Sequence, residues 1–221
     1  MKLLKLISVL LDYPEDDLWA YGDELRDAID DPALSAARRR ALRGFVDELL
    51  ATDVLEAQER WLGLFDRGRA MSLLLFEHIH GESRDRGQAM VDLLATYRKA
   101  GFALGAKQLP DYLPVVLEFL SVQPVAEVRD WLSHVAHILE LLAARAQDRQ
   151  SPYAVLLEAL VEVAKGRVDL DLLPAVDATE VVFPVALGAR FPDQVAEMIA
   201  AARLALLLAH LADVAEEVCR H

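Results

Sequence analysis

The amino-acid sequence predicts an all-α fold, a single-domain multi-helix bundle. Of the 221 residues, 54% are hydrophobic, alanine and leucine dominate, and only 10 glycines and 9 prolines interrupt the chain. Alanine and leucine are strong helix formers. Aromatic residues amount to 7%, and they and the β-branched residues are too scarce for an all-β fold. Apolar residues also recur at helical spacing, as Leu42, Phe45, Val46 and Leu49 do at i, i+3, i+4 and i+7.

Four helices are expected before Gly68. The first ends before Pro14, and the second begins with acidic residues, which suit the positive end of a helix dipole. Pro32 is expected to open the third helix, and Asp53 to cap the fourth. Gly68 breaks or kinks the chain after them. The predicted ranges are Lys2–Asp12, Glu15–Ile29, Pro32–Ala51 and Asp53–Phe65.

Three helices are expected in the middle of the chain. Gly81 is predicted to stop the first of them, and Gly101 the second. Asp111 is predicted to cap the third, which Pro110 and Pro114 orient. The predicted ranges are Met71–His80, Glu82 or Ser83 to Ala100, and Asp111–Ser121.

The last part of the chain is predicted to hold three more helices, over Val125–Arg149, Pro152–Lys165 and Pro192–Cys219. Between the last two, residues 167–191 are expected to be a loop, or a short extended segment around Val181–Leu187. We therefore expect one helical domain over residues 1–221. It has a core at residues 1–165 and a distinct C-terminal segment at 166–221, and its hinge is expected at residues 109–114.

Composition excludes several classes of function. The net charge of −13 would repel a phosphate backbone, so nucleic acid is not expected as a partner. Cys219 is the single cysteine, which excludes a disulfide framework, an iron–sulfur cluster or a cysteine-rich zinc site within one chain. We expect a protein of the cytoplasm, without a leader and without membrane insertion, because the apolar stretch 198–212 is interrupted by Arg203 and His210.

No catalytic set stands out in the sequence. His78 and His80 are two residues apart, so on a helix they point about 200° away from each other and do not readily share a metal ion. Neither a nucleophile elbow nor a glycine-rich phosphate loop is present. We therefore expect a binding protein and not an enzyme, with no catalytic residue, no metal site and no permanently bound cofactor.

Two charged segments, residues 66–69 and 82–87, flank the apolar run 71–76. One interpretation is an ion-pair network that joins two helices, and the other is a recognition patch, because arginine forks hold carboxylates and carbonyl-rich ligands. We expect Arg84 to be structural and Arg86 to lie nearer the binding surface. The dense apolar residues at 73–79 and 112–120 likewise fit either a buried helix or a groove for another protein's helix.

These residues resemble a known family. The runs FDRGRAMSLLLFEHIHGESRDRGQAMVDLLATY and LPDYLPVVLEFLS resemble the respiratory nitrate reductase assembly chaperones, the delta-subunit group of NarJ and NarW. That group belongs to the TorD-like redox enzyme maturation proteins. LISVLLDYPEDDLW and QDRQSPYAVLLEAL also fit. The resemblance covers about residues 3–160 and fades after Lys165.

The resemblance implies an all-helical, system-specific cytoplasmic chaperone of the TorD-like type. Its partner would be the apo catalytic (molybdenum) subunit of respiratory nitrate reductase, bound through the N-terminal peptide of that subunit. The chaperone would hold this client while molybdenum cofactor and an iron–sulfur cluster are inserted, and leave before membrane assembly. Molybdenum cofactor biosynthesis proteins are further expected partners. Two alternatives stay open: a helical scaffold or regulator without such a client, and a protein that handles GTP or another nucleotide.

Three segments are expected to converge on the client peptide: residues 67–76, 78–86 and 109–118. Short connections between helices usually make them neighbours. The candidate contacts are Phe65, Arg67, Arg69, Leu75, Phe76, His78, Glu82, Asp85, Arg86, Pro110, Asp111, Tyr112, Leu113 and Glu118.

Overall fold

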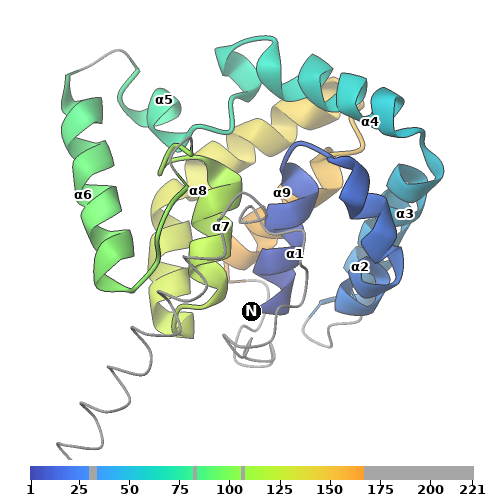
Figure 1. Ribbon diagram of the computed structural model, residues 1–221, viewed down its shortest axis with the longest axis horizontal. Helices are drawn as coiled ribbons and strands as arrows, with labels where there is room; N and C mark the ends of the chain where they lie inside the picture. Colours follow the sequence, from blue (N-terminus) through green and yellow to red (C-terminus); the bar gives the residue numbers. More distant parts are fainter. Residues whose placement is uncertain (30–33, 82–83, 106–107, 167–221) are drawn as a thin grey trace, which may run out of the picture.

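The protein is helical throughout the part that its computed structural model describes, residues 1–29, 34–81, 84–105 and 108–166. In these residues nine α-helices follow one another and no β-strand occurs (Figure 1), which confirms the predicted fold class. The helices are α1 (Lys2–Leu11), α2 (Gly22–Ile29), α3 (Ala36–Ala51), α4 (Val54–Trp61), α5 (Leu75–Ile79), α6 (Asp85–Lys99), α7 (Leu113–Ser121), α8 (Val125–Asp148) and α9 (Ala154–Ala164).

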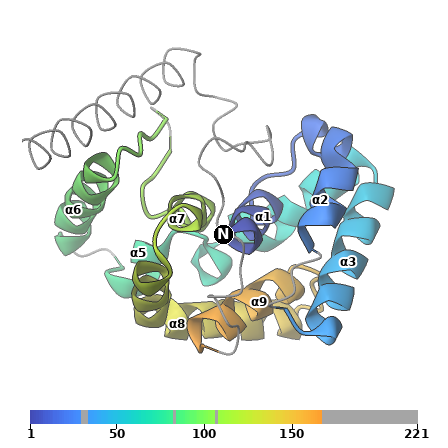
Figure 2. The same ribbon diagram turned by 90° about the horizontal axis from the view of Figure 1, so that it is seen from below.

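Helix α1 lies at the centre of the molecule and is buried on almost every side. Figures 1 and 2 show it beside α7. Both helices are strongly apolar, so each is hidden in the core and not amphipathic at the surface. The polar group of Ser8 is tolerated there because its hydroxyl donates to the Pro114 carbonyl at 2.7 Å. An ion pair of Lys5 and Glu118 joins the two helices near the surface.

Helices α8 and α9 form a layer against α1 and α7. Figure 2 shows this pair crossing one side of the molecule. The 24-residue α8 buries one stripe, which includes Val128, Leu132, Val135 and Leu139, as amphipathic spacing predicts. The buried apolar residues of the described chain form one continuous core cluster.

The remaining helices flank this centre on opposite sides. In Figure 2, α2 and α3 lie on one side, and α6 lies on the other. Arg38 ties α3 to α9, because its guanidinium contacts Glu158 at 3.0 Å and Glu162 at 2.5 Å. Helix α6 is exposed over most of its surface and buries only Leu93 and Tyr97. Its position therefore depends on few contacts.

Several predicted helix boundaries are confirmed. Asp53 caps α4, since its Oδ1 accepts from the Leu55 amide at 2.9 Å. Gly81 and Gly101 follow α5 and α6 with φ of 55° and 73°, the left-handed conformation that ends helices. None of the described helices is both long and apolar enough to cross a membrane.

Other boundaries differ from the prediction. The third helix begins at Ala36, where Ser35 accepts from the Arg38 amide, and not at Pro32. The range expected as one helix from Glu15 is divided into a 3₁₀ segment, Asp16–Tyr21, and α2. The range expected as a helix from Met71 to His80 is a 3₁₀ turn, an extended segment and the short α5. The extended segment is diverted by pairing with a distant part of the chain.

The expectations for residues 167–221, which include the extended segment at Val181–Leu187 and the final helix, lie outside the described residues. So does the predicted helix start at Glu82 or Ser83. The single-domain organisation of the whole chain stays a prediction.

Candidate functional site

Two segments that are distant in the sequence pair with each other at the starts of α5 and α7, where the charged and the proline-rich parts of the sequence meet. The Leu113 amide donates to the Leu73 carbonyl at 2.8 Å, and the Leu75 amide donates to the Asp111 carbonyl at 3.0 Å. Leu74 and Tyr112 thereby form an isolated antiparallel bridge. We call residues 72–77 and 110–113, together with Arg86, the clasp. It joins the start of α5 to the start of α7.

Asp111 is the buried centre of the clasp. Its side chain has no exposed surface, and its Oδ2 accepts from the Phe76 amide at 3.1 Å. The Oδ1 atom is buried and has no hydrogen-bond partner within the described part of the protein. Burial raises the pKa of the Asp111 carboxyl above its ordinary value, although the Phe76 amide and the Arg86 guanidinium oppose this rise.

The predicted role of Asp111 as the cap of its own helix is wrong. Tyr112 precedes α7, and no side chain caps that end. Asp111 instead binds the free amide of the second residue of α5, which lies 35 positions earlier in the chain. Its carboxylate therefore caps the start of α5, a role that is usually played by the side chain of the residue just before the helix.

Arg86 attaches α6 to the clasp. Its guanidinium lies 3.4 Å from the Glu77 carboxylate and 3.7 Å from Asp111 Oδ2. Arg84 is exposed, and the ion pairs to Glu77 and Asp111 belong to Arg86. Through Arg86, the second charged segment therefore takes part in an ion-pair network that joins α6 to α5.

Two tyrosines fix the clasp to its neighbours. The Tyr97 hydroxyl at the end of α6 donates to the Pro110 carbonyl at 2.8 Å, and the Tyr112 hydroxyl donates to Asp12 Oδ1 at 2.8 Å. Burial raises the pKa of both hydroxyls, and the Asp12 charge adds to the rise for Tyr112. Both hydroxyls therefore stay protonated and keep donating.

The structure brings eight of the predicted contact residues together in or beside the clasp. They are Leu75, Phe76, His78, Arg86, Pro110, Asp111, Tyr112 and Leu113, and His78 reaches it through a 2.8 Å contact of its Nε2 with the Ser72 carbonyl. Of these, Leu75, Asp111 and Leu113 are at most 1% exposed. These three hold the surface in shape and do not present atoms to it.

Other predicted contact residues lie elsewhere or are oriented differently. Phe65 is buried against the rings of Trp61 and Tyr153. Glu118 faces Lys5 of α1. The remaining candidates, Arg67, Arg69 and Asp85, are exposed, and Glu82 lies outside the described residues.

The accessible apolar groups next to the clasp are Ile79 and Leu109, each 46% exposed. Both lie within the predicted segments, residues 78–86 and 109–118, but neither was among the residues named as contacts. Their signal in the sequence was their position at the edges of the two apolar runs, next to a helix stop and before a proline. They leave apolar surface in contact with water beside the clasp, which a bound partner would bury.

The chemistry of the clasp suits recognition. Among the described residues, no group of three or more His, Cys, Asp or Glu side chains is placed to hold a metal ion. The clasp offers half-buried aromatic and apolar surface, an ion-pair network and a buried carboxylate. These are the features of a surface that recognises another protein, where apolar side chains are buried on binding and charged groups select the partner.

Comparison with known proteins shows which family the chain resembles. The family model of the nitrate reductase delta subunit matches residues 31–159, which contain the whole clasp. The nitrate reductase molybdenum cofactor assembly chaperone NarJ of Escherichia coli K12 is 48% identical over 169 residues, 76% of this chain and 72% of that protein. The probable chaperone NarW of the same strain is 46% identical over 173 residues, 77% of this chain and 71% of that protein. The probable NarJ of Bacillus subtilis is 31% identical over 156 residues, 70% of this chain and 84% of that protein.

Proposed function

This chain belongs to the nitrate reductase delta-subunit family, and from that premise we propose that it is an assembly chaperone for a respiratory nitrate reductase. The observation that carries the proposal is the family match, which extends over residues 31–159 and so includes the clasp. A relative that is 48% identical over 76% of the chain is a molybdenum cofactor assembly chaperone by name. The chain's own contribution is to bind and hold a client protein and not to transform a substrate.

The client in this proposal is the apo catalytic subunit, held through its N-terminal segment. The segment lies against the clasp, where Ile79 and Leu109 supply apolar surface and Phe76 and Tyr112 supply half-buried rings. An amphipathic helix binds such a surface through residues spaced three or four apart. The net charge of −13 favours a segment that carries lysine or arginine, since opposite charge speeds encounter and rejects acidic competitors.

The chaperone acts in the cytoplasm in this proposal and leaves once the molybdenum cofactor and iron–sulfur cluster are in place. Holding the N-terminal segment keeps the client from closing before insertion. Molybdenum cofactor biosynthesis proteins are the further partners, because cofactor delivery must meet the held client. The chain itself carries no resident cofactor and is not an enzyme.

Calorimetric titration with a synthetic peptide of the catalytic subunit's N-terminal segment tests this proposal. The two exposed clasp residues give the test variants Ile79→Asp and Leu109→Asp. Val122→Asp is the matched control, because Val122 is 47% exposed and follows α7 at the end opposite the clasp. Each clasp variant should weaken binding about tenfold or more, since truncated apolar anchors carry most of the energy of such interfaces. The control should bind as the wild type does.

A wild-type protein that gives no heat of binding with the N-terminal peptide would contradict the proposal. Equal affinities for the two clasp variants and the control would show instead that the peptide binds away from the clasp.

A further inference from the structure

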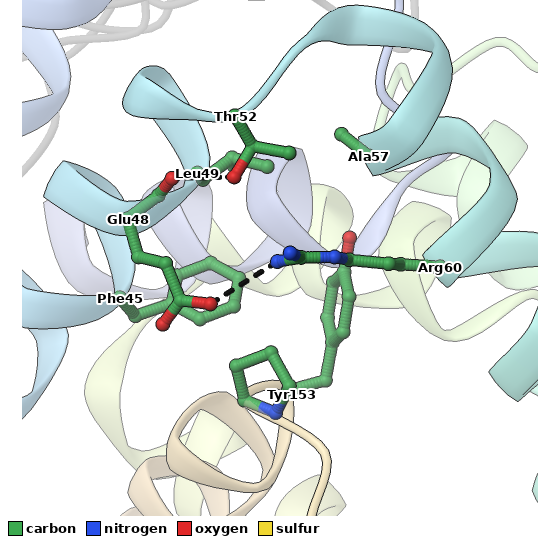
Figure 3. Close-up of a pocket in the computed structure, with 8 residues that line it drawn as sticks. Phe45, Glu48, Leu49, Thr52, Ala57, Arg60 and Tyr153 are labelled. Carbon is green, nitrogen blue, oxygen red and sulfur yellow. Dashed lines mark hydrogen bonds and ion pairs between the residues drawn. The ribbon is translucent and has the colours of Figure 1, made fainter.

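A second binding feature lies on α3 and α4, helices that the clasp does not use. Figure 3 shows a pocket between these two helices and the start of α9. Its volume is about 270 Å³ including its open mouth. The lining residues are Phe45, Glu48, Leu49, Thr52, Ala57, Arg60, Pro152 and Tyr153. In Figure 2, α3 lies on the opposite side of the molecule from α6.

The floor of the pocket is apolar and rigid. The rings of Phe45 and Tyr153 meet edge to face with centroids 5.2 Å apart, and Tyr153 packs in the same way on Phe65. Ala57 contributes only a methyl group and is 1% exposed, so α4 leaves space there. A preformed floor needs no ordering when a ligand arrives, which lowers the cost of binding.

Arg60 covers the mouth of this pocket. Figure 3 shows its side chain extending across the opening toward Glu48, with the Tyr153 ring beneath it. The guanidinium contacts the Glu48 carboxylate at 3.1 Å and the Glu56 carboxylate at 2.7 Å. All three side chains are about half exposed. Ion pairs at that exposure contribute little stability, so a ligand displaces this cover at small cost.

The charges at the mouth select the kind of ligand. Two carboxylates meet a single guanidinium, so the cover has one negative charge in excess. An incoming anion would face both carboxylates, while an incoming ammonium or guanidinium replaces Arg60 between them. Once Arg60 is displaced, the apolar floor beneath takes a small aliphatic side chain. The site therefore matches an apolar residue that has a lysine or arginine close to it in sequence.

We propose that this pocket is a second contact point for the client segment, where it takes one apolar side chain and pairs an adjacent basic residue with Glu48 and Glu56. The inference rests on the proposed function, because the occupant is a second part of the client's N-terminal segment, beyond the part that the clasp holds. Contacts on two sides of the chaperone would make release depend on breaking both, and two weak contacts on one chain bind more tightly than either alone.

Opposite effects of two variants on the same ion pair test the inference. Glu48→Lys places a positive charge at the mouth and should weaken binding of the client's N-terminal peptide about fivefold to tenfold. Arg60→Ala uncovers the pocket and frees both carboxylates, so it should tighten binding by roughly twofold to fivefold. If the ion pair only joined α3 to α4, both variants would act in the same direction or have no effect.

Glu127→Lys is the matched control for overall charge. It changes the net charge as Glu48→Lys does, but Glu127 is exposed in the first turn of α8, a helix that contributes no residue to the lining of the pocket. It should change the affinity less than about twofold. Thermal melting of each variant confirms that it is folded, which is expected because the replaced carboxylates are exposed.

The ¹³C-labelled methyl group of Ala57 gives a direct reading of the pocket, because this methyl lines it and is otherwise buried. Its resonance should shift as the peptide is titrated into wild-type protein. A peptide that binds without shifting this resonance, and with equal affinity for Glu48→Lys and Glu127→Lys, overturns the second contact point and leaves the assembly function in place. A wild-type protein that does not bind the peptide overturns both.

Discussion

Replacing Asp111 with alanine should lower the free energy of unfolding by about 2 kcal/mol. The carboxylate accepts from the Phe76 amide at 3.1 Å at a site with no exposed surface. A hydrogen bond to a charged group contributes about 1.5–3 kcal/mol, and its loss also leaves the amide without that partner. The Arg86 side chain is 27% exposed and keeps its ion pair with Glu77 in the variant. Losing the contact with Asp111 therefore adds little to the destabilisation. Relief of the buried charge offsets part of the total.

Asparagine at the same position separates the hydrogen bond from the charge. Its amide oxygen still accepts from Phe76, and its amide nitrogen takes the place of the Oδ1 atom that has no partner within the described residues. Asp111→Asn should therefore cost less than about 1 kcal/mol, since a neutral hydrogen bond replaces a charged one. Urea unfolding of the full chain, followed by far-ultraviolet circular dichroism, measures both variants.

Two results would refute this reasoning. An alanine variant that loses less than about 0.5 kcal/mol would show that the bond to α5 contributes nothing net. An asparagine variant as unstable as the alanine variant would show that the charge, and not the hydrogen bond, holds the clasp.

Three further predictions follow from the contacts. Burial raises the pKa of the Asp111 carboxyl, so the folded protein binds a proton at this group more tightly than the unfolded chain does. Lowering the pH from about 7 to about 4 should therefore stabilise the wild type relative to Asp111→Asn, as measured by urea titrations at the two pH values. Tyr97→Phe removes the hydroxyl that donates to Pro110 and should cost about 0.5–1.5 kcal/mol, measured by chemical unfolding; a neutral result would show that the bond adds no net stability. Arg38→Ala unpairs two α9 glutamates and should cost about 1–2 kcal/mol, with Arg40→Ala, exposed on the same helix, as the control in thermal melts.

Local signals in the sequence predicted most of the helices because helices form from local contacts. The apolar stripe of α3, the Asp53 cap and the glycine stops all act within a few residues of the element that they define. The family resemblance carried the function, since the quoted runs are long and contiguous.

The clasp could not be predicted in detail because its bonds are long-range. An apolar run from Met71 to Phe76 fits a helix by composition, but the pairing of Leu74 with Tyr112, 38 residues later, draws part of it into an extended form. An aspartate just before a helix is a typical N-cap pattern, yet the Asp111 carboxylate accepts from the Phe76 amide of α5 and not from its own helix, α7. Tertiary contacts override local preference at these positions.

The pocket was missed for a related reason. The spacing of Phe45 and Leu49 is that of an ordinary buried helix face. Glu48 and Arg60 have the pattern of charged residues at the surface. Nothing in the spacing shows that Ala57 leaves space opposite the Phe45 and Tyr153 rings, because the three come from three different helices or their ends.

The molybdenum content of the client tests the central claim most directly. The catalytic subunit that this chain serves would be produced in cells with and without the chain, purified, and its molybdenum measured by mass spectrometry. The account predicts a client that is filled with molybdenum when the chain is present and largely empty when it is absent, with Leu109→Asp in between. Equal molybdenum content with and without the chain would contradict it.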